Sequence, residues 1–564
     1  MTGSDAMVQC LEKEGVTTVF GYPGVAICPF YNSILDTKIQ TVLVRTEQNA
    51  AHMASGMARL TGKPGVCAVT SGPGATNVIT GIATAFADSI PLVCITGQVE
   101  SSLLGSDVFQ EADITGATES FVKYSYLVKD VGDIPRIIKE AFHIANTGRK
   151  GPVLIDVPFD VQRAQLKEFT YPSEVSIRTY KPTVKGHAVQ IKKVITQLQC
   201  AKRPIICVGG GVLLAQAQQI VRSFAEKHKI PVVSTMMGIG VMPTEHPQNY
   251  GMVGNNGNTY ANRAMNESDL LLMVGARVAD RAVSQPGLIT QNKVLVHIDV
   301  DPAEIGKNAG PTIPLVGDAA HIFSQMHEEA FASDYTQWNQ TLSRYRTQAQ
   351  ENTVSNPSFV NPASLLRSLS LAMEEDAIYV ADVGQNQIWS CRYHVVKKGR
   401  FLTSGGMGTM GYSIPAAMGA KIACPQRQVV AVCGDGSFQM SMMELATMRQ
   451  HGIAIKIVVI QNGSLGMVRE FQHFSYEDHY SVIDLSGSPD LSKIAEAYGL
   501  PFIRIVPDGT LGNRSSQEED QMKRTVYEAH EMEEAIAHFL DMKGSVLMEC
   551  QIDPMALVKI PNNL

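Results

Sequence analysis

The sequence predicts an α/β fold of three doubly wound parallel-sheet domains in series. Short apolar, β-rich runs alternate with helical stretches over residues 1–165, and the same rhythm returns over 187–335 and 362–564. Strands that alternate with helices form parallel sheets covered on both faces. Polar stretches interrupt the rhythm at 171–183 and 333–361, which are predicted linkers. A chain of 564 residues is also long enough for about three domains.

Individual elements follow from the apolar pattern of each block. In the first block the expected strands are Thr41–Val44, Val66–Thr70, Leu92–Thr96 and Val153–Val157, and the expected helices are Gln48–Arg59, Ala75–Ala87 and Ile134–Ala145. In the second block the expected strands are Ile205–Val208, Val232–Thr235, Leu270–Val274 and Val294–Ile298. In the third block Ala377–Ala381 and Ile453–Ile460 are expected strands, and Phe438–Gln450 is an expected helix. Residues 507–528 are polar and lack apolar periodicity, so a surface loop is predicted there.

Composition excludes several classes of protein. The chain is 45% hydrophobic and 18% charged, with a net charge of −7 and no basic cluster, which argues against a nucleic-acid partner. Its ten cysteines are scattered singly, so neither a zinc site nor a disulfide scaffold is expected. Residues 1–5 lack the features of a secretion signal, and the most apolar strand contains Lys456 and is too short for a membrane span. A cytoplasmic protein without a membrane partner is predicted.

Polar residues follow two successive strands of the third block. Gly434-Asp435-Gly436-Ser437 ends one apolar run, and Asn462 ends the next, 27 positions after Asp435. At neighbouring tips of a parallel sheet, the carboxylate, the amide oxygen and a loop carbonyl would form an oxygen shell suited to Mg²⁺ and phosphate. The two glycines allow close backbone approach, and the following helix directs its N-terminal N–H groups at the anion. An incidental Asp in an ordinary strand–turn–helix is the alternative, but the pattern resembles the signature of thiamine-diphosphate enzymes.

Glu47 lies just after the expected strand Thr41–Val44. Taken alone, a Glu in the first turn of a helix is most often a surface charge that favours the helix dipole. Beside a thiamine site the interpretation changes, because the pyrimidine ring of that cofactor needs a carboxylate at one ring nitrogen for proton transfer. The carboxylate would come from the first domain and the metal from the third, so a dimer is the expected unit.

Several glycine-rich turns are weak signals when each is taken alone. After expected strands come Gly21-Tyr22-Pro23-Gly24, Ser71 to Asn77, Gly384-Gln385-Asn386, and Ser404 to Gly411 with Gly408 and Met410. The backbone and side-chain donors of Gly384, Gln385 and Asn386 could hold a diphosphate, and Met410 could support a bent cofactor, although plain packing is commoner for Met. In the second block the turn Gly209-Gly210-Gly211, with Gly275 to Arg281 and Asp299, predicts a nucleotide pocket.

Together these segments resemble the acetohydroxyacid synthase (acetolactate synthase) large-subunit family over almost the whole chain. The motifs that distinguish this family from other thiamine enzymes are Phe109 to Asp113, Ser404 to Gly411 and Leu465 to Arg469. Gly275 to Arg281 and His297 to Asn308 resemble the FAD-binding segments of its biosynthetic members. The resemblance implies three cofactors: thiamine diphosphate, Mg²⁺ and FAD.

The resemblance also implies roles for individual residues. Glu47 would activate the cofactor, Gln110 would hold the reacting species, and Mg²⁺ would be bound by Asp435, Asn462 and the Ser464 carbonyl. Arg149 and Arg281 would contact FAD or the second substrate. Further cofactor contacts would come from Gly384, Gln385, Asn386, Gly408, Met410, Gly434, Gly436, Ser437, Met467, Gly209, Gly210, Gly211, Arg277, Asp299 and Asp318. The substrate channel would be lined by Phe109, Met467, Val468 and Phe471.

The chain departs from the family pattern at four positions. The family usually has Gly where Val25 stands, Lys where Phe159 stands, His near Asn256 and Trp where Phe471 stands. These departures leave the cofactor chemistry intact. They concern instead the preference for the second substrate and the sensitivity to herbicides.

The implied reaction decarboxylates pyruvate and joins the remaining two-carbon unit to a second 2-oxoacid, pyruvate or 2-oxobutanoate. It is the first common step toward valine, leucine and isoleucine. A homodimer or tetramer and a small regulatory subunit are the implied partners. The alternatives are a flavin-dependent pyruvate oxidase, a catabolic acetolactate synthase, a glyoxylate carboligase, which lacks the equivalent of Glu47, and a non-catalytic paralogue, which has no need for Glu47, Asp435 and Asn462 together.

Overall fold

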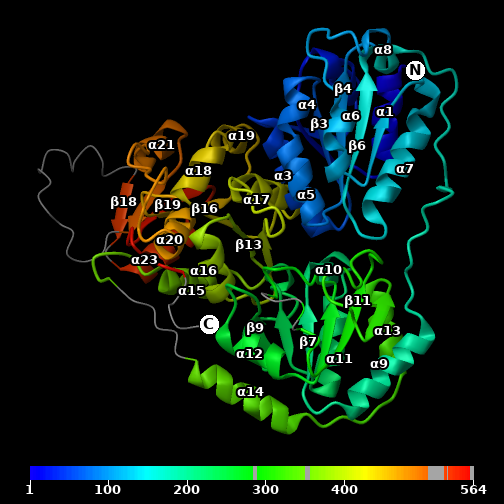
Figure 1. The fold of residues 1–564 in the computed structure, drawn as a ribbon. Helices are drawn as coiled ribbons and strands as arrows, with labels where there is room; N and C mark the ends of the chain where they lie inside the picture. The colour runs from blue at the N-terminus through cyan, green and yellow to red at the C-terminus, as the bar shows by residue number, and fades with distance from the viewer. Residues whose placement is uncertain (284–286, 288, 350–355, 506–525, 530, 559–564) are drawn as a thin grey trace, which may run out of the picture. The chain divides into compact units, whose positions relative to one another are not determined.

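The computed structural model describes the whole chain except residues 284–286, 288, 350–355, 506–525, 530 and 559–564. Contacts within the chain divide it into two compact units. The first unit contains Met1–Lys181, Ser404–Val429 and Phe438–Ile455, and the second contains Pro182–Thr403, Val430–Ser437 and Lys456–Leu564. One sheet lies in the first unit and two lie in the second, so the predicted three-sheet α/β fold is confirmed (Figure 1).

The first sheet has six parallel strands in the order β2-β1-β3-β4-β6-β5. Its strands are β1 (Thr18–Tyr22), β2 (Gln40–Leu43), β3 (Gly65–Val69), β4 (Leu92–Gln98), β5 (Tyr124–Leu127) and β6 (Pro152–Pro158). Its helices are α1 (Gly3–Lys13), α2 (Cys28–Ile34), α3 (Glu47–Thr61), α4 (Pro73–Asn77), α5 (Ile79–Ala87), α6 (Ile114–Thr118), α7 (Ile134–Asn146) and α8 (Phe159–Arg163). The expected helix Ala75–Ala87 is therefore two helices, separated at Val78.

Burial explains why these segments form a doubly covered sheet. Strands β3, β4 and β6 are buried at every residue, as expected for strands covered on both faces. Helix α7 presents Ile134, Ile137, Ile138 and Ala141 to the core that it shares with α1 and α2. Helix α3 packs on β1, β3 and β4, and α5 packs on β4 and β6. The same unit contains α17 (Ser413–Ala423) and α19 (Glu444–Gln450), and α17 packs along α3.

The central sheet also has six parallel strands, in the order β12-β11-β10-β7-β8-β9. Its strands are β7 (Pro204–Val208), β8 (Val232–Ser234), β9 (Asn249–Met252), β10 (Leu270–Val274), β11 (Val294–Asp299) and β12 (Ile313–Val316). Its helices are α9 (Ala188–Cys200), α10 (Gly210–Leu214), α11 (Gln218–His228), α12 (Thr259–Glu267) and α13 (Ala319–Glu328). The predicted linker 171–183 contains neither helix nor strand.

The second predicted linker is wrong over much of its length, because α14 (Thr336–Gln348) lies within 333–361. Tyr335, Trp338 and Leu342 are buried against the central sheet, with Tyr345 packed beside them. Their spacing of three, four and three residues places them on one face of a helix. The Tyr335 hydroxyl donates to Leu198 O at 2.5 Å, and Trp338 Nε1 donates to Pro204 O at 3.1 Å. Three of these four residues are aromatic and also carry a polar group. Within a polar sequence they were not recognised as the apolar face of a helix.

The third sheet has seven strands in the order β14-β13-β15-β16-β19-β17-β18. Its strands are β13 (Ile378–Ala381), β14 (Arg400–Thr403), β15 (Val429–Gly434), β16 (Lys456–Gln461), β17 (Phe502–Ile505), β18 (Val526–Ala529) and β19 (Val546–Gln551). Helices in the same part of the chain are α15 (Pro362–Ala372), α16 (Gln385–Tyr393), α18 (Asp435–Ser441), α20 (Gly466–Ser475), α21 (Leu491–Ala497) and α23 (Met532–Asp541).

Three expectations for the third block need correction. The expected helix Phe438–Gln450 is two helices, α18 and α19, and the expected strand Ile453–Ile460 begins only at Lys456. Residues 526–528, predicted as part of a loop, belong to β18, which pairs in parallel with β17. The remainder of that predicted loop lies almost entirely within 506–525, outside the described residues.

Candidate active site

In each sheet the first strand lies between the second strand and a later one, so the strand order reverses beside it, and a predicted glycine-rich turn follows that first strand. The first sheet reverses between β1 and β3, the central sheet between β7 and β10, and the third sheet between β13 and β15. Loops on the two sides of such a point diverge, which opens a crevice at the carboxyl ends of the strands where ligands bind in α/β proteins. In the third sheet the two loops are those that carry Gln385 and Asp435.

The predicted metal ligands meet at the carboxyl end of the third sheet. Strands β15 and β16 pair with Gly434 opposite Ile460, so Asp435 and Asn462 follow neighbouring strand ends. Asp435 is buried, and its carboxylate accepts from Gly463 N at 2.8 Å and from Gly436 N at 3.1 Å. Burial raises the pKa of the Asp435 carboxyl. Asn462 Oδ1 accepts from Ser464 N at 3.0 Å, which closes the turn after β16.

Three observations show that this end of the sheet fits a magnesium diphosphate. Asn386 is buried, yet neither polar atom of its carboxamide has a hydrogen-bond partner. The Ser464 hydroxyl is buried and unpartnered as well. A Cβ built at Gly434 would lie 3.8 Å from Asn386 Nδ2, so the glycine leaves the backbone open beside that amide. Unpaired buried polar groups cost free energy, and a ligand with oxygen atoms and a divalent cation would satisfy this set.

Gln385 is held toward the same strand ends by contacts that the sequence did not reveal. Its Nε2 donates to Glu470 Oε2 at 2.8 Å and to Ala556 O at 2.9 Å, and its Oε1 accepts from Asn462 Nδ2 at 3.3 Å. A Cβ at Gly466 would lie 2.1 Å from Gln385 Oε1, so only glycine fits there. Glu470 is a buried carboxylate in α20, and only its place in the fold identifies it.

Three of the four predicted channel residues, Met467, Val468 and Phe471, lie on α20 and differ in burial. Met467 packs against the core of the third sheet. Val468 and Phe471 are exposed, Phe471 to 58%, and the Phe471 ring meets Tyr476 edge-on at 5.9 Å. These two side chains are free to contact a ligand, whereas Met467 also has a packing role.

Glu47 and Gln110 are placed around one turn in the first unit. Glu47 is the first residue of α3, and its Oε2 accepts from Asn77 Nδ2 at 3.1 Å. A Cβ at Gly74 would lie 3.3 Å from Glu47 Oε1, and one at Gly72 would lie 2.9 Å from Gln110 Cα. The turn from Ser71 to Asn77 therefore lies between Glu47 and Gln110, and both residues pack closely against its glycines.

The loop that carries Gln110 is shaped by a neighbouring carboxylate. Gln110 has a φ of +60°, an uncommon conformation for a residue other than glycine. The Glu111 carboxylate accepts from the backbone N–H groups of Gly105 and Val108, which lowers the pKa of Glu111. Phe109 is 88% exposed, so its ring is available to a ligand.

Comparisons with known proteins agree with this geometry. The chain matches the thiamine pyrophosphate enzyme family in three parts: the N-terminal TPP binding domain at residues 1–117, the central domain at 191–326 and the C-terminal TPP binding domain at 382–550. It is 42% identical to the acetolactate synthase large subunit of Lactococcus lactis, over 91% of this chain and 89% of that protein. It is 43% identical to the acetolactate synthase large subunit of Corynebacterium glutamicum, over 90% of this chain and 82% of that protein. It is 41% identical to the probable large subunit of Methanocaldococcus jannaschii, over 90% of this chain and 88% of that protein.

The chain belongs to the acetolactate synthase large-subunit family. The predicted resemblance is therefore confirmed, and the chain is a thiamine-diphosphate-dependent enzyme. Its cofactors are thiamine diphosphate and, as is typical of this family, Mg²⁺ and FAD. Among the described residues, no helix combines the length and apolar character that a membrane crossing needs.

The glycines of the central turn have a packing role. Gly209 N donates to Val274 O and Gly211 N to Gly275 O, both at 2.9 Å. A Cβ at Gly211 would lie 2.7 Å from Gly275 Cα. The two turns at the switch point of the central sheet therefore pack backbone to backbone. The N–H groups of Gly209 and Gly211 already donate within the protein, so a contact of these two glycines with FAD, which stays a prediction, would not use them.

The other residues predicted to contact FAD differ in burial and in the contacts they make within the protein. Asp318 caps α13, accepting from Ala320 N at 2.9 Å and His321 N at 3.3 Å, which explains this residue without a ligand. Asp299 is buried and accepts from Asp301 N. Arg281 is exposed, and Arg277 is half-buried. In the first unit, Arg149 Nε donates to Ser89 Oγ at 3.1 Å, and its guanidinium lies over Phe86.

The loop with Gly408 and Met410 is anchored within the first unit. Thr409 N donates to Ser404 Oγ at 3.1 Å, and the hydroxyls of Thr409 and Thr84 lie 2.7 Å apart. Gly408 has a φ of +69°, and a Cβ there would meet open space. Its N–H and the half-buried Met410 are carried on a firmly held loop.

The structure shows the surroundings of three residues that depart from the family pattern. Val25 is 75% exposed. Phe159 begins α8, with the Arg163 guanidinium 5.5 Å from its ring centre. The Asn256 carbonyl accepts from Arg392 Nε at 2.9 Å. None of the three side chains belongs to a buried core, so each substitution leaves the packing of its domain intact.

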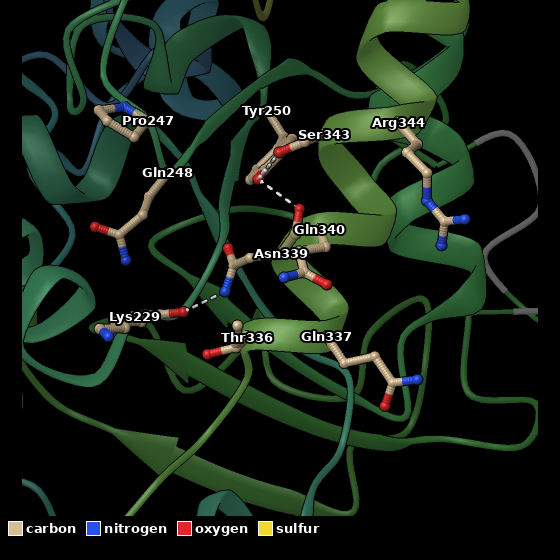
Figure 2. Close-up of a pocket in the computed structure, with 10 residues that line it drawn as sticks. All are labelled: Lys229, Pro247, Gln248, Tyr250, Thr336, Gln337, Asn339, Gln340, Ser343 and Arg344. Carbon is tan, nitrogen blue, oxygen red and sulfur yellow. Dashed lines mark hydrogen bonds between the residues drawn. The ribbon is translucent and has the colours of Figure 1, made fainter.

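A polar groove of about 950 Å³ lies in the second unit, along α14 (Figure 2). Asn339 Nδ2 donates to Lys229 O at 2.9 Å, and the Tyr250 hydroxyl donates to Asn339 O at 3.3 Å. The lining residues are Lys229, Pro247, Gln248, Tyr250, Thr336, Gln337, Asn339, Gln340, Ser343 and Arg344. None of them is a predicted site residue, and no acid–base pair is among them.

Proposed function

We propose that this protein decarboxylates pyruvate and joins the two-carbon unit to a second 2-oxoacid, pyruvate or 2-oxobutanoate. The products would be 2-acetolactate and 2-aceto-2-hydroxybutanoate, at the first common step of valine, leucine and isoleucine synthesis. The observation that carries this proposal is the buried, unpaired carboxamide of Asn386 beside the Asp435–Asn462 pair. A buried polar group without partners, next to a buried carboxylate at the ends of neighbouring strands, supports a site for a charged ligand at this end of the sheet.

The residues at the carboxyl end of the third sheet would bind the metal and the diphosphate. Asp435, Asn462 Oδ1 and the Ser464 carbonyl would ligate Mg²⁺, which neutralises diphosphate charge and has no role in activating water. The Asn386 carboxamide would donate to phosphate oxygens near Gly384, Gly434 and Gly436. Gln385 and Ser437 would contribute their backbone N–H groups, because their side chains already donate to acceptors within the protein. The raised pKa of Asp435 fits this role, because a buried carboxylate is stabilised by a cation.

Glu47 would act on protons. The bound cofactor supplies an electron sink for decarboxylation once its pyrimidine ring is in the correct tautomer. The Glu47 carboxylate would share a proton with one ring nitrogen of that pyrimidine. Asn77 supports this role, since its amide fixes one carboxylate oxygen and leaves the other directed past Gly74.

The second substrate would be held by a mixed set of side chains. Gln110 would donate to an oxygen of the reacting species, and Phe109, Val468 and Phe471 would form an apolar wall. The exposure of these three apolar side chains is compatible with the assignment, because it leaves them accessible to a substrate. Met467, Gly408 and Met410 would support the cofactor.

FAD would serve a structural role in the central domain. Gly210, Arg277, Arg281 and Asp299, with Arg149, remain the residues proposed for it, while Gly209, Gly211 and Asp318 contribute packing and helix capping. The domains proposed are 1–165 for the pyrimidine, 187–335 for FAD and 362–564 for the diphosphate.

The proposed assembly is a cytoplasmic homodimer or tetramer joined by a small regulatory subunit. The large-subunit names of the relatives support such a partner. A dimer would let Glu47 of one copy serve the cofactor held by Asp435 of the other.

The proposal is tested by incubating the purified protein with pyruvate, thiamine diphosphate, Mg²⁺ and FAD, with and without 2-oxobutanoate. We expect 2-acetolactate and CO₂ in equal amounts, the second product when 2-oxobutanoate is added, and no oxygen consumption. The Asp435→Ala variant is the control for contaminating activity. Acetate formation with oxygen uptake would indicate an oxidase, and product from glyoxylate alone would indicate a carboligase of another class; either result would contradict the proposal.

A further inference from the structure

Glu444 is a fully buried carboxylate that the proposed mechanism does not use. It is the first residue of α19, and its side chain is 0% exposed. A buried carboxylate is retained only when its oxygens have enough partners to offset the loss of hydration. Its partners lie about 400 positions earlier in the sequence, in the same compact unit.

The carboxylate of Glu444 binds the turn that leads into α3. Its Oε1 accepts from Arg45 N at 2.9 Å, from Thr46 N at 3.3 Å and from Asn49 Nδ2 at 2.9 Å. Its Oε2 accepts from Thr447 Oγ1 at 2.6 Å. Two backbone donors and one side-chain donor therefore converge on a single oxygen atom, on either side of Glu47.

Other residues of α19 and the residue after it bind the same turn. Leu43 N donates to His451 Nε2 at 3.1 Å, and Arg45 Nη2 donates to Gln450 Oε1 at 2.8 Å. Thr447 Oγ1 also lies 3.2 Å from Leu43 O. The backbone from Leu43 to Thr46 is thus fixed along one helix, and Glu444 supplies the contacts nearest to Glu47.

We propose that Glu444 is a positioning residue for Glu47. The start of α3 has no cap of its own, because the Thr46 side chain makes no capping hydrogen bond. Glu444 instead fixes the N–H groups of the two residues before the helix and the Asn49 side chain in its first turn, and its charge is favourable at the N-terminal end of α3. The direction of the Glu47 side chain depends on the backbone at residues 45 and 46, which Glu444 holds. This inference rests on the proposed role of Glu47.

The argument predicts different results for two substitutions. Glu444→Gln keeps an oxygen that can accept from Arg45 N, Thr46 N and Asn49 Nδ2. Its new amide can donate to Thr447 Oγ1, whose hydroxyl can still donate to Leu43 O. Glu444→Ala removes every one of these contacts. A positioning role is therefore rescued by Gln and lost with Ala, whereas a role for the charge itself would be lost in both variants.

The first experiment compares steady-state kinetics of the holoenzyme with amide hydrogen exchange of residues 43–50. For Glu444→Ala we expect kcat to fall about tenfold or more, since small misplacement of a catalytic group has effects of up to about 10²-fold. KM for pyruvate and the cofactor dissociation constant should change less than about twofold, and amide exchange at Arg45 and Thr46 should accelerate. Glu444→Gln should behave like the wild type. Glu14→Ala is the matched control, because it removes a carboxylate bound by Lys139 and Tyr171 in the same unit.

The second experiment combines Glu444→Ala with Glu47→Gln. If Glu444 acts through Glu47, the double variant should be no slower than Glu47→Gln alone. Fully multiplicative losses, or an unchanged kcat in Glu444→Ala, would overturn the inference. Should the Ala variant fail to fold, Glu444→Asp, which withdraws the carboxylate by one methylene, takes its place in both experiments with the same outcomes. A Glu47→Gln variant of normal turnover would instead refute the proposed role of Glu47.

Discussion

Asn77 donates a hydrogen bond from Nδ2 to Glu47 Oε2 at 3.1 Å, across the turn that follows β3. The two residues begin α3 and end α4, so helices on both sides of the turn determine where the carboxylate points. One oxygen of Glu47 is occupied by this bond, and the other lies next to the position where Gly74 lacks a side chain. A carboxylate held in this way has one free oxygen for a proton.

Glu47→Gln should fold and bind cofactor normally but lose most turnover. An amide cannot take up or release the proton that a carboxylate shares with the cofactor ring, and removal of such a group lowers rates by roughly 10²-fold or more. Turnover is measured with pyruvate, and cofactor binding by quenching of intrinsic fluorescence. Glu12→Gln, at a solvent-exposed position of α1, is the control. A kcat close to the wild-type value would remove Glu47 from the mechanism.

Asp435→Asn should raise the concentrations of Mg²⁺ and thiamine diphosphate that activity requires. The substitution preserves the shape of the side chain but removes the charge that faces the metal, and we expect an increase of about tenfold or more. The measurement is a two-dimensional titration of activity against both cofactors. Asp541→Asn, at an exposed position of the same unit, should leave the titration unchanged. Identical curves for Asp435→Asn and the wild type would place the metal elsewhere.

Gly466→Ala should weaken cofactor binding without altering Glu47. The added Cβ would lie 2.1 Å from Gln385 Oε1 and 2.5 Å from Asn462 Nδ2, so both side chains must move. Overpacking of this kind costs about 1–3 kcal/mol. Calorimetric titration of cofactor and Mg²⁺ measures the effect. Gly487→Ala, whose Cβ would meet no atom within 4 Å, is the matched control; equal affinities for the two variants would contradict the assignment of Gln385 and Asn462.

Asp156→Asn should change how stability depends on pH. Burial raises the pKa of the Asp156 carboxyl to about 7, although Thr96 and Gln98 donate to it at 2.6 Å and 3.0 Å. Because the folded pKa lies above the unfolded pKa of about 3.9, this group favours folding at low pH, and that contribution is lost as pH rises toward 7.

Between the unfolded and the folded pKa of Asp156, the free energy of unfolding falls by at most about 1.4 kcal/mol per pH unit. We therefore expect the thermal midpoint of the wild type, relative to Asp156→Asn, to decline from pH 5 to pH 7 and then to level off. A difference between the two proteins that stays constant over this range would show that Asp156 does not titrate there. Asp541→Asn again serves as the control for an exposed carboxylate.

Phe471→Trp should increase the preference for 2-oxobutanoate over a second pyruvate. Phe471 is largely exposed on α20, so an indole has room to extend its apolar surface. One methyl group of a substrate contributes on the order of 1–3 kcal/mol to the free energy of discrimination in a close-fitting pocket, and less in a looser one. The product ratio is measured with both acceptors in one vessel, together with binding of a sulfonylurea. If neither changes, Phe471 does not line the acceptor pocket.

Most of the elements that local sequence patterns predicted agree with the structure within a residue or two. Leu270–Val274 was predicted with its observed bounds, because an apolar run buried on both faces leaves no ambiguity in type or length. The helix α14 was missed, since its buried face is built from Tyr335, Trp338 and Tyr345, whose aromatic rings bury apolar surface while their polar tips bond to distant groups. Phe438–Gln450 was predicted as one helix because nothing in its composition marks the break between α18 and α19.

The sequence by itself determined the chemistry of the site. Asp435 and Asn462 follow successive strands, and because these two strands are neighbours in the sheet, the two residues follow adjacent strand ends, as their positions in the sequence predicted. The role of Glu47 was predicted from its place after a strand together with the thiamine site, and that of Gln110 was implied by the family resemblance. Periodicity and strand ends are properties of short segments, which is why they could be predicted without coordinates.

Only the tertiary structure decided which of these groups are paired and which are free. It showed that Asn386 is buried without a partner, that Gly209 N and Gly211 N are already engaged, and that Glu444 binds the backbone next to Glu47. Each of these facts depends on backbone groups contributed by segments far apart in the chain. Hydrogen bonds act over about 3 Å, so their partners are determined only when the packed fold brings such segments together.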